Sequence, residues 1–391
     1  MSDSAVVPEE EPPPRLYLHI GLPKSGSTFL QSLLGGNRSV LKENGYIYPY
    51  VRQEGMFHAA LEMAGKPAAW GLTAEAVEGA FADLLRRGRN FGGRVVISHE
   101  IFSAASPQQV EVIAERLVDF EVHLVVTVRN LGRVVTAQWQ ERVKNGHPDS
   151  FAEYSDAVIA DLPGEGEDQG TSVFWRGQDL AALLARWAVV APPERTHLVV
   201  TPGAGAGPDG LWNRFATAID LPPGLIDPAT APQGNESLGA AQVAFLRQVL
   251  TSLDGRLEQP WYSVVAKRWF AQTILGTVRG RKAVAPATVA ERLTGVARSW
   301  SELVRTGGYQ VYGDLDELVP EVPAPGTPTP DEVTAAEMLD GLSDAVALML
   351  LRARDDRAAI QALEAENELL TAQVAGLTEA AERRRWWRRR T

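Results

Sequence analysis

Residues 16–28 read Leu16-Tyr17-Leu18-His19-Ile20-Gly21-Leu22-Pro23-Lys24-Ser25-Gly26-Ser27-Thr28, and this stretch decides the fold. Its first five residues form an apolar run that predicts a buried strand, and the turn that follows, rich in glycine and hydroxyl side chains, opens a helix. In such a turn successive backbone N–H groups gather at the positive end of the helix, so main chain and helix dipole together bind a phosphate group. We therefore predict a phosphate-binding loop at residues 24–28.

Short apolar runs rich in β-branched residues alternate with longer stretches of helical periodicity along the first 200 residues. The predicted strands are Leu16–Ile20, Val95–Ser98, Val122–Val128 and Leu198–Val200, and the predicted helices are Thr28–Leu34, Ala74–Arg87, Pro107–Leu117, Leu131–Val143 and Asp179–Val189. This alternation predicts an α/β fold in three layers, with a mostly parallel sheet flanked by helices. From Asp209 to about Val304 the pattern is mainly helical.

The composition of the two ends separates them from the main domain. Residues 1–14 are acidic and rich in proline, which predicts a disordered leader ahead of a domain at 15–320. Pro320–Pro330 carries five prolines, so residues 321–330 are predicted to be a linker. Residues 331–391 are predicted to form a helical tail with a basic end.

Composition and charge exclude several classes of function. The chain of 391 residues contains no cysteine, so disulfides and thiolate metal sites are excluded. A formal net charge of −11 argues against a general nucleic-acid binder, and no nucleic-acid partner is expected. The sequence has no apolar run of membrane-spanning length and its start lacks the apolar stretch of a signal peptide, so we expect a cytoplasmic protein.

Polar residues follow the predicted strands where each of them ends. The second strand runs into Ser98-His99-Glu100, and the third runs into Arg129-Asn130. Because ligands of open parallel sheets bind at the carboxyl ends of the strands, we expect these residues to meet the phosphate-binding loop at one edge.

The loop differs in one respect from the G-x-x-x-x-G-K-[ST] loop that binds nucleoside triphosphates. Ser27 stands where that loop has lysine, and a lysine is found at position 24 instead. A strand, the run Pro23-Lys24-Ser25-Gly26-Ser27-Thr28 and a helix, in this order, resemble the 5′-phosphosulfate loop of sulfotransferases that use 3′-phosphoadenosine 5′-phosphosulfate (PAPS). Over about residues 15–320 this resemblance implies a P-loop NTPase-like sulfotransferase fold, PAPS as co-substrate, and no metal.

The same resemblance implies roles for individual residues. Lys24, Ser25, Gly26, Ser27 and Thr28 would bind the 5′-phosphosulfate, with Lys24 stabilising the charge that develops on the 5′-phosphate oxygen. Arg129 resembles the arginine that binds the 3′-phosphate. The family pairs it with a serine eight residues further on, where this chain has Ala137, so Thr136 is the expected substitute.

The resemblance offers two candidates for the general base. His99 is similar in placement to the base of small-molecule sulfotransferases, whereas carbohydrate sulfotransferases use a carboxylate, which here would be Glu100. The predicted reaction is therefore transfer of a sulfuryl group from PAPS to a hydroxyl or amine of a small-molecule or glycan acceptor.

Two other functions are weighed against this one. A non-catalytic, sulfotransferase-derived nucleotide-binding or scaffold protein would explain Ala137 and the long tail. A P-loop kinase would use the same fold, but it needs a lysine at position 27 and an aspartate at a strand end for magnesium.

The tail carries apolar residues at heptad spacing. One seam position holds Ile360, Asn367 and Val374, and the other holds Leu363, Leu370 and Leu377. This pattern predicts a homodimer through a parallel two-stranded coiled coil, and an amphipathic helix folded back on the enzyme has similar spacing.

The chain ends in arginines that flank Trp386 and Trp387, within residues 383–390. Such an end suits peripheral contact with an anionic membrane, and it equally suits a solvated basic tail.

Overall fold

The computed structural model of the chain describes residues 12–52, 54–164, 172–203, 205–231 and 237–388. The chain divides into two compact units. Unit 1 comprises Met1–Ser237 and Ala283–Glu332, and unit 2 comprises Leu238–Lys282 and Val333–Thr391. Most of the predicted acidic leader, residues 1–11, lies outside the described part, as do residues 165–171 and the last residues of the basic end, 389–391.

Unit 1 contains a six-stranded sheet in the order β2-β3-β1-β4-β5-β6, and every neighbouring pair is parallel. The strands are β1 (Arg15–His19), β2 (Tyr46–Ile47), β3 (Arg94–Ser98), β4 (Glu121–Val128), β5 (Thr196–Val200) and β6 (Gln310–Tyr312). The predicted α/β fold with a parallel sheet flanked by helices is confirmed. The two edge strands, β2 and β6, are too short for a periodic pattern to predict them.

The helices of unit 1 connect the strands and cover the sheet. They are α1 (Ser27–Gly36), α2 (Arg38–Glu43), α3 (Gly55–Ala64), α4 (Ala74–Val77), α5 (Ala80–Phe91), α6 (Pro107–Arg116), α7 (Leu131–Lys144), α8 (Phe151–Ala160), α9 (Val173–Gln178), α10 (Leu180–Trp187), α11 (Gly207–Ala218) and α13 (Ala287–Thr306). Short 3₁₀ turns are η1 (Pro67–Trp70), η2 (Glu100–Ala104), η3 (Pro193–Arg195), η4 (Pro223–Leu225), η5 (Pro228–Thr230) and η8 (Leu315–Leu318). The single helix predicted over Ala74–Arg87 is wrong, because Gly79 with a φ of 74° separates α4 from α5.

The two faces of the sheet are covered by different helices. On one face Tyr17, Val125 and Val199 pack in a buried cluster with residues of α1 and α11, among them Leu30 and Trp212. On the other face, α5 approaches β3 so closely that a Cβ at Gly88 would lie 3.0 Å from the Val95 side chain. The sheet is therefore buried on both faces, as parallel sheets require.

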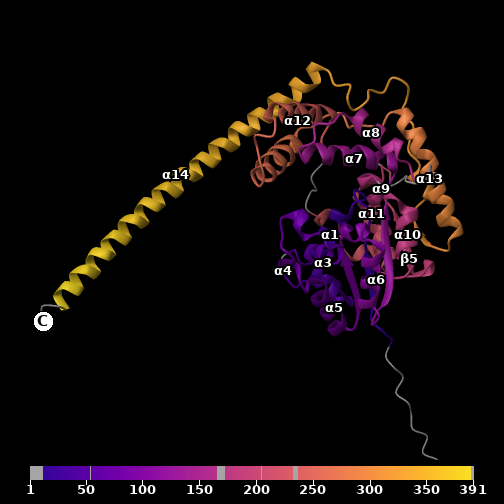
Figure 1. The fold of residues 1–391 in the computed structure, drawn as a ribbon, viewed down its shortest axis with the longest axis horizontal. Coiled ribbons are helices and arrows are strands. Elements are labelled where there is room, and N and C mark those ends of the chain that lie inside the picture. Colours follow the sequence, from indigo (N-terminus) through magenta and orange to yellow (C-terminus); the bar gives the residue numbers. More distant parts are fainter. Residues whose placement is uncertain (1–11, 53, 165–171, 204, 232–236, 389–391) are drawn as a thin grey trace, which may run out of the picture. The chain divides into compact units, whose positions relative to one another are not determined.

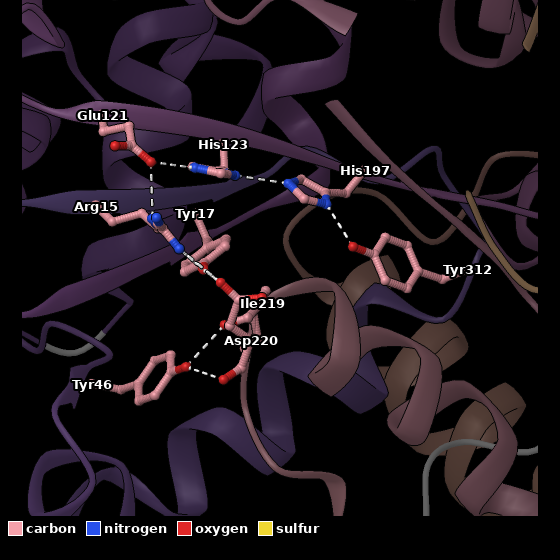
Figure 2. Close-up of polar contacts among 9 residues, drawn as sticks. All are labelled: Arg15, Tyr17, Tyr46, Glu121, His123, His197, Ile219, Asp220 and Tyr312. Carbon is pink, nitrogen blue, oxygen red and sulfur yellow. Dashed lines mark hydrogen bonds and ion pairs between the residues drawn. The ribbon is translucent and has the colours of Figure 1, made fainter. Parts of the chain in front are cut away.

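A polar network joins β1, β2, β4, β5 and β6 to the residues that follow α11 (Figure 2). It contains Arg15, Tyr17, Tyr46, Glu121, His123, His197, Ile219, Asp220 and Tyr312. Glu121 accepts from Nε2 of His123 at 2.7 Å, Nδ1 of His123 is 2.8 Å from Nε2 of His197, and the Tyr312 hydroxyl is 3.0 Å from Nδ1 of His197. These contacts link β4, β5 and β6, so the network serves to hold the sheet together.

Unit 2 consists of α12 (Ala240–Leu253), the π-helical segment η6 (Tyr262–Ile274), the short turn η7 (Leu275–Thr277) and the long helix α14 (Ala335–Arg388), drawn in yellow in Figure 1. The start of α14 is tied within this unit by a contact of 3.2 Å between Arg281 and Glu337. The predicted C-terminal helical tail is confirmed. Within the described ranges, no helix is long and apolar enough to cross a membrane.

Candidate functional site

The predicted phosphate-binding loop connects the end of β1 to the start of α1, which begins at Ser27. Lys24 and Gly26 have φ angles of 67° and 100°, in the left-handed region. At Gly26 a Cβ would also lie 2.4 Å from the Leu211 side chain, so glycine is required there both by the backbone and by packing. The loop turns sharply enough to direct its N–H groups to one side.

Three successive carbonyl groups of the loop are held by side chains from outside it. Pro23 O accepts from Nε2 of Gln178 at 2.8 Å, Lys24 O from Nη1 of Arg129 at 3.1 Å, and Ser25 O from Oγ1 of Thr201 at 2.7 Å. The donors belong to α9 and to the ends of β4 and β5. Because the N–H of a trans peptide points opposite to its carbonyl, this fixes the N–H groups of the loop on the other side.

Two of those N–H groups are available to a ligand, whereas the N–H of Ser25 donates to Leu22 O at 3.2 Å. The backbone N–H groups of Lys24 and Gly26 have no hydrogen-bond acceptor in the described part of the chain. Ser27 and Thr28 occupy the first turn of α1, where N–H groups lack an intrahelical acceptor, and no side chain caps this helix. The positive end of α1 is therefore open to an anion.

A cavity of about 360 Å³ lies over these N–H groups. It is lined by Pro23, Lys24, Gly26, Ser27, Thr28, Glu100, Arg129, Ala137, Gln140, Lys144 and Ser237. The lining contains three cationic side chains and one carboxylate. The structure thus brings together the loop, the arginine and the carboxylate that the sequence placed at the strand ends.

Two buried polar atoms at this cavity lack a partner among the described residues. They are Oγ of Ser27, whose residue is 5% exposed, and Nε of Arg129. Buried polar atoms are normally paired, so both point to a ligand that supplies acceptor oxygens.

Arg129 is positioned by the junction of β4 and α7. Asn130 ends the strand and caps the helix, since its Oδ1 accepts from the backbone N–H of Arg133 at 3.2 Å. Burial, and after it the charge of Arg133, lowers the pKa of Arg129 from its usual value. A guanidinium nevertheless stays charged in a protein, so this buried cation favours the binding of an anion.

Glu141 of α7 holds two of the cations. Its Oε2 lies 2.9 Å from Nζ of Lys24 and 2.9 Å from Nζ of Lys144. Three residues here were not predicted from the sequence: Gln140, Glu141 and Lys144. The spacing from Ala137 to Gln140 and Lys144 is nevertheless that of one helix face.

The structure turns Thr136 away from the cavity. Its Oγ1 donates to carbonyl oxygens of its own helix, at 3.3 Å from Gly132 O and 3.0 Å from Arg133 O, and Ala137 lines the cavity instead. The predicted contact of Thr136 with a 3′-phosphate is therefore replaced in this wall by an apolar methyl group.

The Ser25 side chain is buried beneath the loop and belongs to a chain of hydrogen bonds that starts at His19. Nδ1 of His19 is 2.7 Å from Oγ of Ser98, and Nε2 is 3.1 Å from Oγ1 of Thr127. Thr127 Oγ1 lies 2.6 Å from Ser25 Oγ, which donates to Leu22 O. Burial lowers the pKa of His19 to about 4. The Ser25 hydroxyl thus supports the loop from beneath, and Ser25 is not among the residues that line the cavity.

His99 and Glu100, the two candidate bases, have different surroundings. Nδ1 of His99 accepts from the backbone N–H of Ile101 at 3.2 Å, so the neutral ring carries its proton on Nε2. Burial lowers the pKa of His99, an effect that the charge of Glu100 opposes. Glu100 lines the cavity, and its Oε2 accepts from Nε2 of Gln31 at 3.1 Å. The carboxylate, rather than the imidazole, is the group that the geometry presents as a proton acceptor.

Aromatic side chains adjoin His99. The ring of Phe57 lies 5.5 Å from that of His99 and 5.2 Å from that of Trp70, which is 60% exposed. Trp175 is fully buried and donates through Nε1 to Val158 O, so it belongs to the core.

No group of three or more His, Cys, Asp or Glu residues in the described ranges is arranged to hold a metal ion.

Comparisons with known proteins give weak similarity to solved structures. No protein-family model matches the chain. No curated protein matches it either. A solved structure described as "Sulfotransferase Domain from the Curacin Biosynthetic Pathway" is 16% identical, covering 76% of this chain and 99% of that one, with a TM-score of 0.31. Function is therefore argued from the site itself.

Proposed function

We propose that this chain is a sulfotransferase that uses PAPS as the donor. The observation that carries the proposal is the preorganised loop, whose carbonyl groups at Pro23, Lys24 and Ser25 are each held from outside while the N–H groups of Lys24 and Gly26 remain open. Donors that are fixed before the ligand arrives need no reorganisation during the reaction. They fit a 5′-phosphosulfate at the positive end of α1.

The cationic side chains take distinct roles in this proposal. Lys24 compensates the charge that appears on the 5′-phosphate oxygen as the sulfuryl group leaves. Arg129, with its unpartnered Nε, binds the 3′-phosphate through two parallel hydrogen bonds. Ser27 donates its buried hydroxyl to a phosphate oxygen.

The reaction breaks the bond between sulfur and the 5′-phosphate oxygen and forms a bond between sulfur and the acceptor oxygen or nitrogen. The products are 3′-phosphoadenosine 5′-phosphate (PAP) and a sulfated acceptor, and the acceptor proton passes to a base. We assign Glu100 as that base, because it lines the cavity and is held by Gln31. His99 donates from Nε2 and orients the acceptor, since its Nδ1 is occupied by Ile101.

The side chains near the base indicate what the acceptor presents. Phe57 and Trp70 form an aromatic surface beside His99, so a small-molecule acceptor with an apolar body next to its hydroxyl fits better than a highly charged glycan.

A second candidate, a nucleotide-binding protein without transfer activity, is favoured by one observation. Thr136 is turned to its own helix and Ala137 lines the wall, so among these positions only Arg129 is offered to a 3′-phosphate. Binding of PAP without transfer to any acceptor would support this candidate. The kinase alternative is disfavoured because a serine hydroxyl occupies the position of the triphosphate-binding lysine.

The decisive experiment compares nucleotide binding in three forms of the protein. Calorimetry should show that the wild-type chain binds PAP more tightly than ATP. Arg129→Ala should weaken PAP binding by about 10- to 150-fold, the loss of a charge-assisted contact of about 1.5–3 kcal/mol. Arg142→Ala is the matched control and should bind PAP normally, because Arg142 lies on α7 and pairs with Asp149 outside the cavity lining.

Turnover separates the catalytic role from binding. Lys24→Ala should reduce sulfuryl transfer to a panel of alcohols, phenols and amines far more than it weakens PAP binding, because its main partner is charge that grows in the transition state. Glu100→Gln should abolish transfer and leave PAP binding nearly intact. Tighter binding of ATP than of PAP would refute the proposal outright.

A further inference from the structure

The second half of α14 packs against no other described part of the chain. Every described side chain from Leu350 to Ala381 is exposed, whereas the contacts of α14 with α12 and η6 lie at its beginning, where Ala345 is fully buried. Isolated helices are marginal in water, and most of their stability in proteins comes from packing of an apolar face. A long exposed helix therefore needs a partner.

The exposed segment presents a continuous apolar seam. Ile360 and Val374 are 45% and 61% exposed, and they share one seam position with Asn367. Leu363, Leu370 and Leu377, which are 64%, 52% and 72% exposed, occupy the other. A spacing of 3.5 residues keeps such a seam facing one neighbour only when both helices supercoil around each other. The partner that fits this seam is therefore a second helix with the same heptad spacing.

We propose that residues 360–377 form a parallel, in-register, two-stranded coiled coil with a second copy of this chain. β-branched residues at the first seam position and leucine at the second favour two strands. This inference is independent of the proposed catalytic function, because assembly is measured without substrate.

Asn367 selects the orientation and the register. In a parallel, in-register pair, Asn367 faces Asn367 of the second copy, and the two amides hydrogen-bond to each other. A shift by one heptad places it against Ile360 or Val374, and an antiparallel pair places it against a leucine. Either arrangement buries an amide without a partner, which is costly.

Charged residues define where the pairing begins. In a parallel pair Arg352 of one copy would lie next to Arg357 of the other, and Asp356 would occupy a seam position. Both features oppose pairing upstream, so the helices separate before residue 357 and unite from Ile360 onward.

The first test measures the mass of the full chain in solution by light scattering over a range of concentrations. The wild type should be a dimer. Leu370→Glu should shift it to the monomer, because two like charges would meet in the seam. Leu369→Glu, one residue away and off the seam, is the matched control and should remain dimeric. Both leucines are exposed in the single chain, so neither change disturbs its core.

The second test uses the absence of cysteine, since each single substitution then introduces the only thiol. Leu363→Cys and Leu377→Cys should each form disulfide-linked dimers under mild oxidation, whereas Ala365→Cys, on the outer face, should not. A monomeric wild type, a trimer, or a dimer in which Leu377→Cys fails to cross-link would each overturn the proposal.

Discussion

The buried imidazole of His19 should make the stability of this protein sensitive to mild acid. His19 is fully buried, and its two ring nitrogens are engaged with Ser98 and Thr127. The hydroxyl of Ser25 donates to Leu22 O, so Thr127 must donate to Ser25 and accept from His19. The neutral ring therefore carries its proton on Nε2 and accepts at Nδ1 from Ser98, and a second proton would place a charge in a fully buried site.

The magnitude follows from the difference between the folded and unfolded pKa. Burial lowers the pKa of His19 to about 4, against about 6.5 in the unfolded chain. Between these values the unfolded state binds a proton that the native state does not, so the free energy of unfolding falls as the pH falls. The full difference is about 3 kcal/mol, of which about 2 kcal/mol is lost between pH 7 and pH 5. Below about pH 4 the native state is protonated as well, and the loss stops growing.

Chemical denaturation at pH 7 and at pH 5 measures this loss. The wild type also contains His197, whose pKa burial lowers to about 4, and carboxylates that act in the same direction, so the comparison must be made between variants. His19→Gln should reduce the stability difference between the two pH values by about 2 kcal/mol. His147→Gln, which removes an exposed histidine, should leave the difference unchanged. If His19→Gln retains the full wild-type difference, His19 is not the neutral link that we describe.

Three further predictions concern the loop and its surroundings. Glu141→Gln removes the carboxylate that lies 2.9 Å from Nζ of both Lys24 and Lys144. The affinity for PAP, measured by calorimetry, should then rise about two- to fivefold, which is the size expected for a partly exposed ion pair. A fall in affinity would contradict the role that we give to Glu141. Gly21→Ala would place a Cβ 1.9 Å from Oγ1 of Thr127 and should cost about 1–3 kcal/mol in a denaturant titration. Gly36→Ala, in α1, would place its Cβ in open space and should cost nothing. Thr201→Val removes the donor to Ser25 O and should lower stability by about 1 kcal/mol while weakening PAP binding, whereas Thr217→Val, on the surface of α11, should leave PAP binding unaffected.

Much of the fold was predictable because the decisive signals are local. The runs at β1, β3, β4 and β5 are apolar and β-branched, and the helices between them have clear periodicity, so strand order along the chain and the parallel sheet followed. The strand ends located Lys24, Arg129 and Glu100, because parallel topology brings carboxyl ends to one edge. The edge strands β2 and β6 could not be predicted, since two or three residues show no period and their pairing depends on tertiary contacts.

The details of the site could not be predicted, because they depend on which way individual side chains point in the folded protein. Whether Thr136 or Ala137 faces the cavity is a question of helix rotation, and the structure answers it in favour of Ala137. Ser25 lies in the predicted loop, yet its hydroxyl points into the core toward Thr127. Gln178 and Thr201 donate to loop carbonyl groups that lie 155 and 176 residues away in the sequence, so no local motif could predict their role.

The loop is thus held from two sides by different kinds of contact. From outside, Gln178, Arg129 and Thr201 hold three carbonyl groups, and from beneath, the chain from His19 fixes Ser25. Arg129 belongs to both the support and the cavity, because Nη1 donates to Lys24 O while Nε is left without a partner in the described ranges. A ligand that accepts a hydrogen bond from Nε therefore binds the same guanidinium group that holds the carbonyl of Lys24 through Nη1. Binding at the arginine and order in the loop should for this reason be coupled, and a bisphosphate that reaches both should stabilise the protein more than two separate phosphate ions do.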